Sequence, residues 1–196
     1  WTAAARRHAG RSRMQTLILY STTDGHTLRI CRFLQRLLAA GQDAEAVLLP
    51  IENAADIRLG DYGGVIIGAS IRYGKHSPLV TEFVNSHAAL LETLPNAFFS
   101  VNLVARKSGK NSPEGNPYVK KFLRQIAWKP RRVAVFAGKL DYPRYRFLDR
   151  QIIRLIMWMT GGPTDSKAVV EYTDWQQVEE FGRSFCEGSG AAASLQ

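Results

Sequence analysis

Short apolar runs alternate with longer amphipathic stretches along most of the chain. Five of these runs, at 16–20, 44–49, 64–68, 97–103 and 132–137, have the length and composition of buried strands. Between them, apolar residues recur at helical spacing, which predicts helices at 27–40, near 79–91 and around 118–126. Strands that alternate with helices predict βαβ units, and therefore a parallel sheet with helices on both faces.

The number of strands narrows the fold class. Five strands within residues 14–187 favour one α/β domain with a flavodoxin-like, doubly wound, five-stranded parallel sheet over a barrel or a six-stranded dinucleotide-binding fold. In such sheets a ligand binds beyond the carboxyl ends of the strands. The loops that follow Tyr20, Gly68, Leu103 and Ala137 are therefore the candidate ligand-binding loops.

The two ends of the chain differ in composition from the middle. Residues 1–13 hold four Arg and no acidic residue, and we interpret them as a non-native or disordered leader, with an Arg-rich transit peptide as the alternative. Residues 188–196 have the composition of a linker-like tail. The formal net charge is +9, and without residues 1–13 it is +5, from 22 basic and 17 acidic residues. We predict no nucleic-acid partner.

The residue types support neither a membrane-spanning helix nor a metal site. No apolar run reaches the roughly 20 residues that a membrane-spanning helix needs. Cys31 and Cys186 lie far apart, each in a helix-like pattern, which favours reduced structural thiols and a cytoplasmic setting. The four His residues lie singly along the chain, so we predict no metal site.

The loop between the first strand and the first helix is rich in hydroxyl groups. The N-terminus of a helix attracts anions through its unpaired N–H groups and its dipole. Hydroxyls add neutral hydrogen bonds, so the loop is predicted to hold a phosphate monoester, and a plain N-cap turn is the alternative. The residues of this predicted phosphate loop are Ser21, Thr22, Thr23, Asp24, Gly25, His26 and Thr27.

The hydroxyl-rich loop and several further segments resemble those of a known protein family. The hydroxyl-rich loop resembles the FMN phosphate loop of flavodoxins, and the match spans nearly all of residues 14–186. Within that superfamily the chain resembles the flavodoxin-like, quinone-dependent protoporphyrinogen IX dehydrogenase family. The segments that carry this resemblance are LILYSTTDGHT, VIIGASIRYGKH, FFSVNLVARKS, YPRYR, LIMWMTGGPTD and YTDW.

The resemblance implies a function and a set of site residues. It implies an FMN enzyme of haem biosynthesis that oxidises protoporphyrinogen IX and passes electrons to a membrane quinone, menaquinone or ubiquinone. Two further loops would then flank the flavin ring, where Gly74 lets the backbone approach closely and Tyr73 can stack. These loops are Ser70, Ile71, Arg72, Tyr73 and Gly74 after the third strand, and Asn102, Leu103 and Val104 after the fourth.

Basic side chains beside these loops are candidates for substrate binding. Arg72, Arg106 and Lys107 can pair with a substrate carboxylate or stabilise reduced flavin, and ordinary solvated charge is the alternative. No side chain is identified as a general base.

Residues 139–163 form an insert that we expect to split the last strand. Arg146, Arg150 and Arg154 recur every four residues, so they share one helical face, with apolar residues largely elsewhere. A basic amphipathic helix favours a membrane surface, which with the resemblance implies a peripheral location on the cytoplasmic side of the inner membrane. The alternative is a helix packed on the sheet or against a second copy of the chain in a homo-oligomer.

Three other functions remain open for this fold. One is an electron-carrier flavodoxin, although such carriers are typically acidic and this chain is basic. The second is an NAD(P)H:quinone reductase, and the third is a member that binds no flavin.

Overall fold

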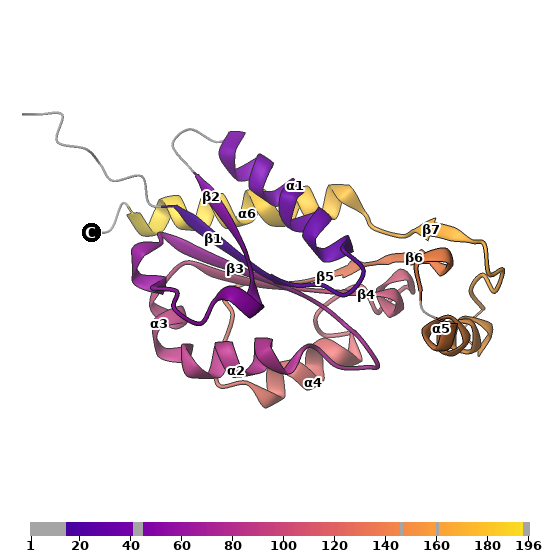
Figure 1. Cartoon of the computed structure of the whole chain (residues 1–196). Helices are drawn as coiled ribbons and strands as arrows, with labels where there is room; N and C mark the ends of the chain where they lie inside the picture. The colour runs from indigo at the N-terminus through magenta and orange to yellow at the C-terminus, as the bar shows by residue number, and fades with distance from the viewer. Residues whose placement is uncertain (1–14, 41–44, 146, 160, 194–196) are drawn as a thin grey trace, which may run out of the picture.

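The computed structural model describes residues 15–40, 45–145, 147–159 and 161–193, the last five by their backbone alone. Five strands form one parallel sheet in the order β2-β1-β3-β4-β5, which confirms the predicted fold (Figure 1). They are β1 (Thr16–Ser21), β2 (Ala46–Pro50), β3 (Gly64–Ser70), β4 (Asn96–Asn102) and β5 (Val133–Ala137). The strand order reverses between β1 and β3, so the loops that leave these two strands meet at the switch point of the sheet.

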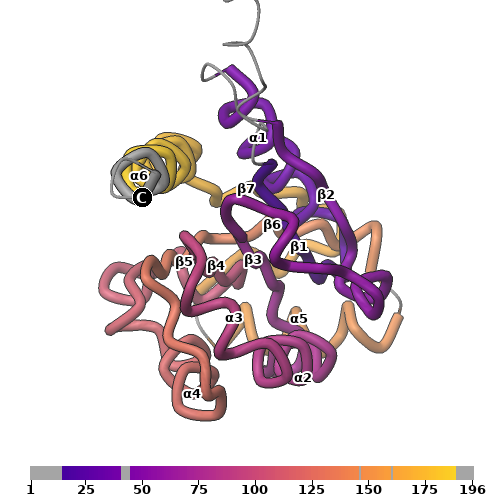
Figure 2. The backbone as a smooth tube through the Cα atoms, turned by 90° about the vertical axis from the view of Figure 1, so that its left-hand side faces the viewer, coloured from indigo at the N-terminus to yellow at the C-terminus, as the bar shows by residue number. Residues whose placement is uncertain are grey.

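Helices cover both faces of the sheet. Figures 1 and 2 show α1 (His26–Ala40) and α6 (Trp175–Ala193) on one side, and α2 (Pro78–Ser86), α3 (Ala88–Thr93) and α4 (Pro117–Gln125) on the other. Successive side chains of a strand point to opposite faces. Leu17 accordingly packs in the core beneath α2, α3 and α4, whereas Ile18 packs in the core beneath α1 and α6. Both cores are apolar, which fits the continuous apolar runs of the strands.

The helix expected near 79–91 is two helices. They meet at His87, whose ring Nδ1 hydrogen-bonds to the Phe83 carbonyl at 2.9 Å. Local bonds between a side chain and the backbone compete with regular helix geometry, and here the chain bends. Short 3-10 turns at Ile51–Asn53 and Leu59–Asp61 complete the connection from β2 to β3.

The insert forms a small body of its own at the carboxyl end of the strands. In the structure this body extends past the expected end at 163, and from here on the insert means residues 139–173. Its strands, β6 (Lys139–Asp141) and β7 (Val169–Glu171), pair antiparallel with each other and lie outside the five-stranded sheet, so the insert does not split a described strand of that sheet as expected. A 3-10 turn (Tyr142–Arg144) and α5 (Phe147–Met159) lie between them (Figure 1). Leu140, Tyr142, Tyr145 and Met157 make a separate apolar core in the insert.

Helix α6 continues to Ala193, past the start of the expected tail at 188, while residues 1–13 lie outside the described ranges. Among the described residues, no helix has the length and apolar character to cross a bilayer. Cys31 is buried, and Cys186 is exposed on α6.

Candidate functional site

The predicted phosphate loop wraps around the first turn of α1. Gly25 has a φ of 80°, a left-handed conformation that favours glycine, and its N–H donates to Thr22 Oγ1 at 3.1 Å. The helix begins one residue later, at His26. The N–H groups of its first turn have no partner within the helix, and with the helix dipole they favour an anion at this end.

Thr27 provides the test of whether a phosphate fits here. Its side chain is 1% exposed, and Oγ1 has no hydrogen-bond partner within the part of the chain that the structure describes. An unpaired buried hydroxyl is costly, and native proteins avoid one unless a ligand or water completes it. Thr27 also lines the hollow described next. A phosphate oxygen at the helix N-terminus is an acceptor of the kind that this hydroxyl lacks.

The three candidate loops converge on one hollow at the carboxyl edge of the sheet. Eight predicted site residues line it: Thr22, Asp24, His26, Thr27, Ser70, Ile71, Asn102 and Leu103. Four lining residues were not predicted: Val101, Gly138, Lys139 and Tyr145. Gly138 lies in the fourth loop that the fold rule indicated, and Lys139 and Tyr145 belong to the insert. The insert is therefore one wall of the site rather than a separate appendage.

The other predicted residues lie beside the hollow. Ser21 is buried at the end of β1, where its carbonyl accepts a hydrogen bond from Ser70 Oγ at 3.5 Å. Thr23 is exposed, and Val104 lies in the 3-10 turn Leu103–Arg106. Gly74 lines a neighbouring pocket, next to the buried His76.

The loop after β4 is held from behind by buried amides. Asn102 Oδ1 accepts from Ala105 N at 3.0 Å and from Asn116 Nδ2 at 3.1 Å, and Asn102 Nδ2 donates to Ser100 Oγ at 3.3 Å. Ser100 Oγ in turn pairs with His76 Nε2 at 3.0 Å. Burial lowers the pKa of His76 to about 4, so this ring is neutral near pH 7. The side chain of Asn102 therefore shapes the loop, and the loop's backbone is left to meet a ligand.

The loop after β3 is a tight turn with an unusual residue in it. Arg72 and Lys75 exchange two backbone hydrogen bonds, of 2.9 and 3.1 Å. Between them, Tyr73 and Gly74 have φ values of 49° and 76°. Positive φ at both central residues is the geometry of a type I′ turn. For a bulky aromatic residue such as Tyr73 this conformation is strained.

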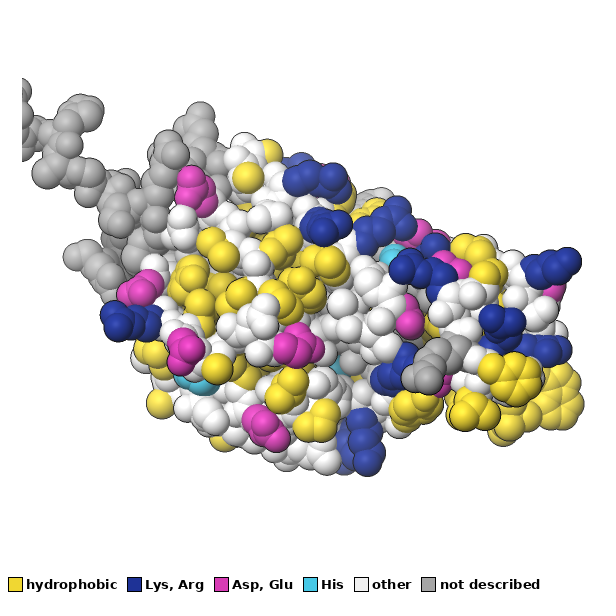
Figure 3. All heavy atoms as spheres, in the orientation of Figure 1, with side chains coloured by type: hydrophobic (Ala, Val, Ile, Leu, Met, Phe, Trp, Pro, Cys, Tyr) yellow, Lys and Arg dark blue, Asp and Glu magenta, His cyan; other side chains and the backbone are white. Residues whose placement is uncertain are grey.

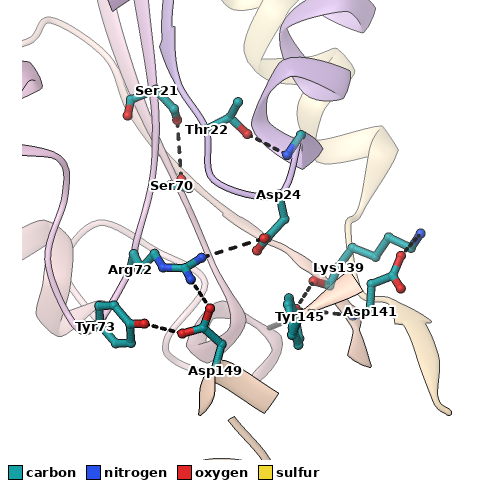
Figure 4. A network of polar contacts seen from close by, with 11 residues as sticks. Ser21, Thr22, Asp24, Ser70, Arg72, Tyr73, Lys139, Asp141, Tyr145 and Asp149 are labelled. Carbon is teal, nitrogen blue, oxygen red and sulfur yellow. Dashed lines mark hydrogen bonds and ion pairs between the residues drawn. The ribbon is translucent and has the colours of Figure 1, made fainter. Parts of the chain in front are cut away.

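Two side chains of this turn, Arg72 and Tyr73, contact the insert. Arg72 Nη2 donates to Asp149 Oδ2, and Tyr73 Oη donates to Asp149 Oδ1, from the first turn of α5 (Figure 4). On its other side, Arg72 Nη1 lies 3.8 Å from Asp24 Oδ1 of the phosphate loop. Burial raises the pKa of Asp24, which Arg72 partly opposes. Asp149 was not predicted, although it is the sole acidic residue of α5.

His26 also contacts the insert. Its Nε2 lies 2.6 Å from Thr173 Oγ1, next to β7, and Arg29 Nη1 lies 2.5 Å from Glu171 Oε2 of the same strand. Burial lowers the pKa of His26, which Glu171 opposes. The ring of His26 thus contacts the segment after β7, and its backbone belongs to the first turn of α1.

The predicted basic residues differ in their surroundings. Arg106 Nη1 donates to the Leu103 carbonyl at 3.0 Å, and its guanidinium lies 6.0 Å from the Tyr172 ring. Lys107 is exposed. Arg150 and Arg154 are half-buried, and Arg150 Nη2 donates to the Tyr145 carbonyl at 3.3 Å. Arg146 lies outside the described residues.

The chain is similar to known proteins over most of its length. Residues 17–167 match a family model described as a flavodoxin domain. The chain is 48% identical to protoporphyrinogen IX dehydrogenase [quinone] of Escherichia coli K12, over 87% of this chain and 93% of that protein. It is 47% identical to the protein of the same name in Leishmania major, over 86% of this chain and 73% of that one. The chain belongs to the flavodoxin-like protoporphyrinogen IX dehydrogenase family.

Solved structures with low sequence identity support the fold of this dehydrogenase-family protein. A flavodoxin from the domain Archaea superposes with a TM-score of 0.50 at 13% identity, over 90% of this chain and 99% of that one. Rubredoxin:oxygen oxidoreductase from Desulfovibrio gigas superposes with a TM-score of 0.52 at 13% identity, over 90% of this chain and 36% of that one.

Membership of the flavodoxin-like dehydrogenase family implies a flavin cofactor, and the hollow fits one. One end has the N-terminus of α1 and the buried hydroxyl of Thr27, which has no partner among the described residues. Its other end lies between two loops whose backbones are fixed, one by the buried amide of Asn102 and one by the turn at Tyr73. An oxidoreductase of this family needs its protein to bind and orient the cofactor, since the cofactor carries the redox chemistry.

Proposed function

We propose that this protein binds FMN in the hollow and oxidises protoporphyrinogen IX to protoporphyrin IX, with a membrane quinone as electron acceptor. Two relatives, 48% and 47% identical to this chain over 87% and 86% of its length, are named protoporphyrinogen IX dehydrogenase [quinone]. The structural observation that supports FMN, rather than a flavin without phosphate, is the buried and unpaired Thr27 hydroxyl at the helix N-terminus.

The residues of the hollow divide the work between the two ends of FMN. Residues 21–27 hold the phosphate through backbone N–H groups and the hydroxyls of Thr22 and Thr27. Residues 70–74 and 102–104 hold the ring through their backbones. Bound FMN supplies a two-electron acceptor for the porphyrinogen and a two-electron donor for the quinone. The protein orients it and limits access of water.

The charge of Arg72 is partly committed within the protein. Its guanidinium pairs with Asp149 and lies near Asp24, so it reaches a substrate carboxylate only in competition with these partners. Lys107 is exposed beside the ring loops and is the better candidate for a propionate of the substrate. We expect Lys107→Ala to weaken porphyrinogen binding more than it changes kcat, and an unchanged KM would contradict this role.

The outer surface of α5 suits a membrane. Seven of the eight exposed residues on this helix are apolar, namely Phe147, Leu148, Ile152, Leu155, Ile156, Trp158 and Met159. Figure 3 shows apolar side chains gathered at that end of the molecule, with Lys and Arg beside them. Large exposed apolar patches indicate an interaction surface, and basic residues near an anionic leaflet add about 1 kcal/mol each. We infer that α5 lies in the surface of the inner membrane on its cytoplasmic side, where a quinone is accessible.

A comparison of electron donors tests the proposal. Purified protein should be yellow and show flavin absorption, and this absorption should disappear when FMN is removed. It should oxidise protoporphyrinogen IX when menaquinone or ubiquinone is present. Turnover with NADPH and quinone, but not with porphyrinogen, would indicate an NAD(P)H:quinone reductase. Flavin without either turnover would indicate an electron carrier.

A further inference from the structure

The insert contacts both loops that flank the proposed ring site. On one side, Leu103 packs against the insert's own core, and Arg106 lies near the Tyr172 ring. On the other side, Asp149 of α5 meets Arg72 and Tyr73 (Figure 4). The second contact is polar and crosses 76 or more residues of sequence, so it is a specific tertiary interaction.

Asp149 is placed to act on the turn after β3. Its side chain is buried, and its two carboxylate oxygens accept from consecutive residues of that turn. Its position in the first turn of α5 puts the negative charge at the positive end of the helix dipole. A buried carboxylate that loses its partners is costly, so the turn and the helix end hold each other in place.

The turn needs such support because Tyr73 is in a left-handed conformation. That conformation persists in a bulky residue only where its surroundings fix it. The hydrogen bond from Tyr73 to Asp149 and the ion pair of Arg72 supply two fixed points, and the exchange of backbone bonds between Arg72 and Lys75 supplies the rest.

We propose that Asp149 is a positioning residue for the cofactor: through Arg72 and Tyr73 it holds the turn after β3 in the conformation that receives the flavin ring. The insert is then part of the flavin site as well as the membrane-facing body. This inference rests on the proposed binding of FMN, but it needs neither the porphyrinogen nor the quinone.

The test uses two ligands that differ only at the phosphate. Apoprotein is titrated with FMN and with riboflavin, and quenching of flavin fluorescence gives each Kd. Asp149→Asn should raise the Kd of both ligands by the same factor, on the order of tenfold. Thr27→Val, the matched variant at the phosphate end, should raise the Kd of FMN and leave that of riboflavin unchanged. Asp56→Asn, at an exposed position in the β2–β3 connection, should change neither.

A double-mutant cycle separates positioning from general loss of structure. If Asp149 acts through Arg72, the variant R72Q/D149N should bind riboflavin no more weakly than the weaker of the two single variants. Thermal unfolding of each apoprotein shows that the variants are folded. Equal riboflavin Kd for wild type and Asp149→Asn, or strictly additive effects, would overturn the inference. A wild-type protein that binds no FMN at all would instead refute the proposed function.

Discussion

Replacing Thr27 with Val should move the stability of the apoprotein and its affinity for FMN in opposite directions. Val keeps the branched shape of Thr and removes the hydroxyl whose Oγ1 is buried without a partner. Most substitutions in a core destabilise a protein, so an opposite sign here has diagnostic value.

The sizes of both effects follow from one hydrogen bond of the Thr27 hydroxyl, which is missing in the apoprotein and expected in the FMN complex. A buried, unpaired hydroxyl costs about 1–3 kcal/mol, so its removal should stabilise the apoprotein by roughly 1 kcal/mol. For a domain of this size, that raises Tm by about 2–4 °C. A hydrogen bond to a charged group contributes about 1.5–3 kcal/mol, so the Kd for FMN should rise roughly ten- to a hundredfold.

Two measurements decide the matter. Thermal unfolding of the flavin-free protein gives Tm, and titration with FMN gives Kd. Thr22→Val is the matched control, because Thr22 Oγ1 already accepts from the Gly25 N–H. Removal of the Thr22 hydroxyl should destabilise the apoprotein and also weaken the binding of FMN. If Thr27→Val instead lowers Tm and leaves the FMN Kd unchanged, the phosphate is not held at this hydroxyl.

Three further predictions concern the insert, a buried histidine and a close approach of backbone to side chain. Replacing Leu155 and Trp158 with Ser should abolish binding to anionic vesicles and leave FMN bound. The control Leu79→Ser, at an exposed site on α2, should leave vesicle binding unchanged. Vesicle binding that survives the double change would contradict the membrane role of α5. His76 has a pKa lowered from 6.5 to about 4, so the unfolded chain binds its proton more readily. Stability should be complete above pH 6.5 and fall as the pH drops towards 4, by roughly 1–3 kcal/mol, in urea unfolding. His76→Asn should flatten that profile, and an unchanged slope would assign it to other groups. Gly68→Ala places a Cβ 2.2 Å from a buried aromatic ring of β4, so we expect a loss of about 3 kcal/mol or more, and an unchanged Tm would show that the ring moves aside.

The fold was predictable because the central strands β1, β3 and β4 are buried on both faces. Runs such as VIIG at 65–68 must lie between two layers of helices, and only a parallel sheet with crossovers supplies that. The break at His87 was not predictable, since apolar spacing continues across it and the ring's bond to the Phe83 carbonyl is a feature of the folded chain.

Local sequence indicated eight of the residues that line the hollow, whereas residues brought there by contacts between distant segments were not indicated. Hydroxyls and Gly25 before a helix indicate an anion site by themselves, and Thr27 lies where that pattern places it. Asp149 has no local signal for its role, because its partners lie 76 and 77 residues away. Lys139 and Tyr145 of the insert line the hollow for a similarly non-local reason.

The orientation of α5 shows what helical spacing leaves undecided. The spacing groups Arg150 and Arg154 on one face of the helix, but it does not say which face meets the protein. In the structure, Arg150 and Arg154 are half-buried towards the insert, and the apolar residues face outwards. An exposed apolar face is unfavourable in water, and the contacts of Asp149 with Arg72 and Tyr73 hold the helix at the turn after β3 while that face is exposed. The same residue thereby fixes the distance between the surface where we propose that a quinone is accessible and the loop where we propose that the flavin ring is bound. An insert held only by apolar contacts could slide or turn, whereas an insert held by a buried charge with two fixed partners has one register.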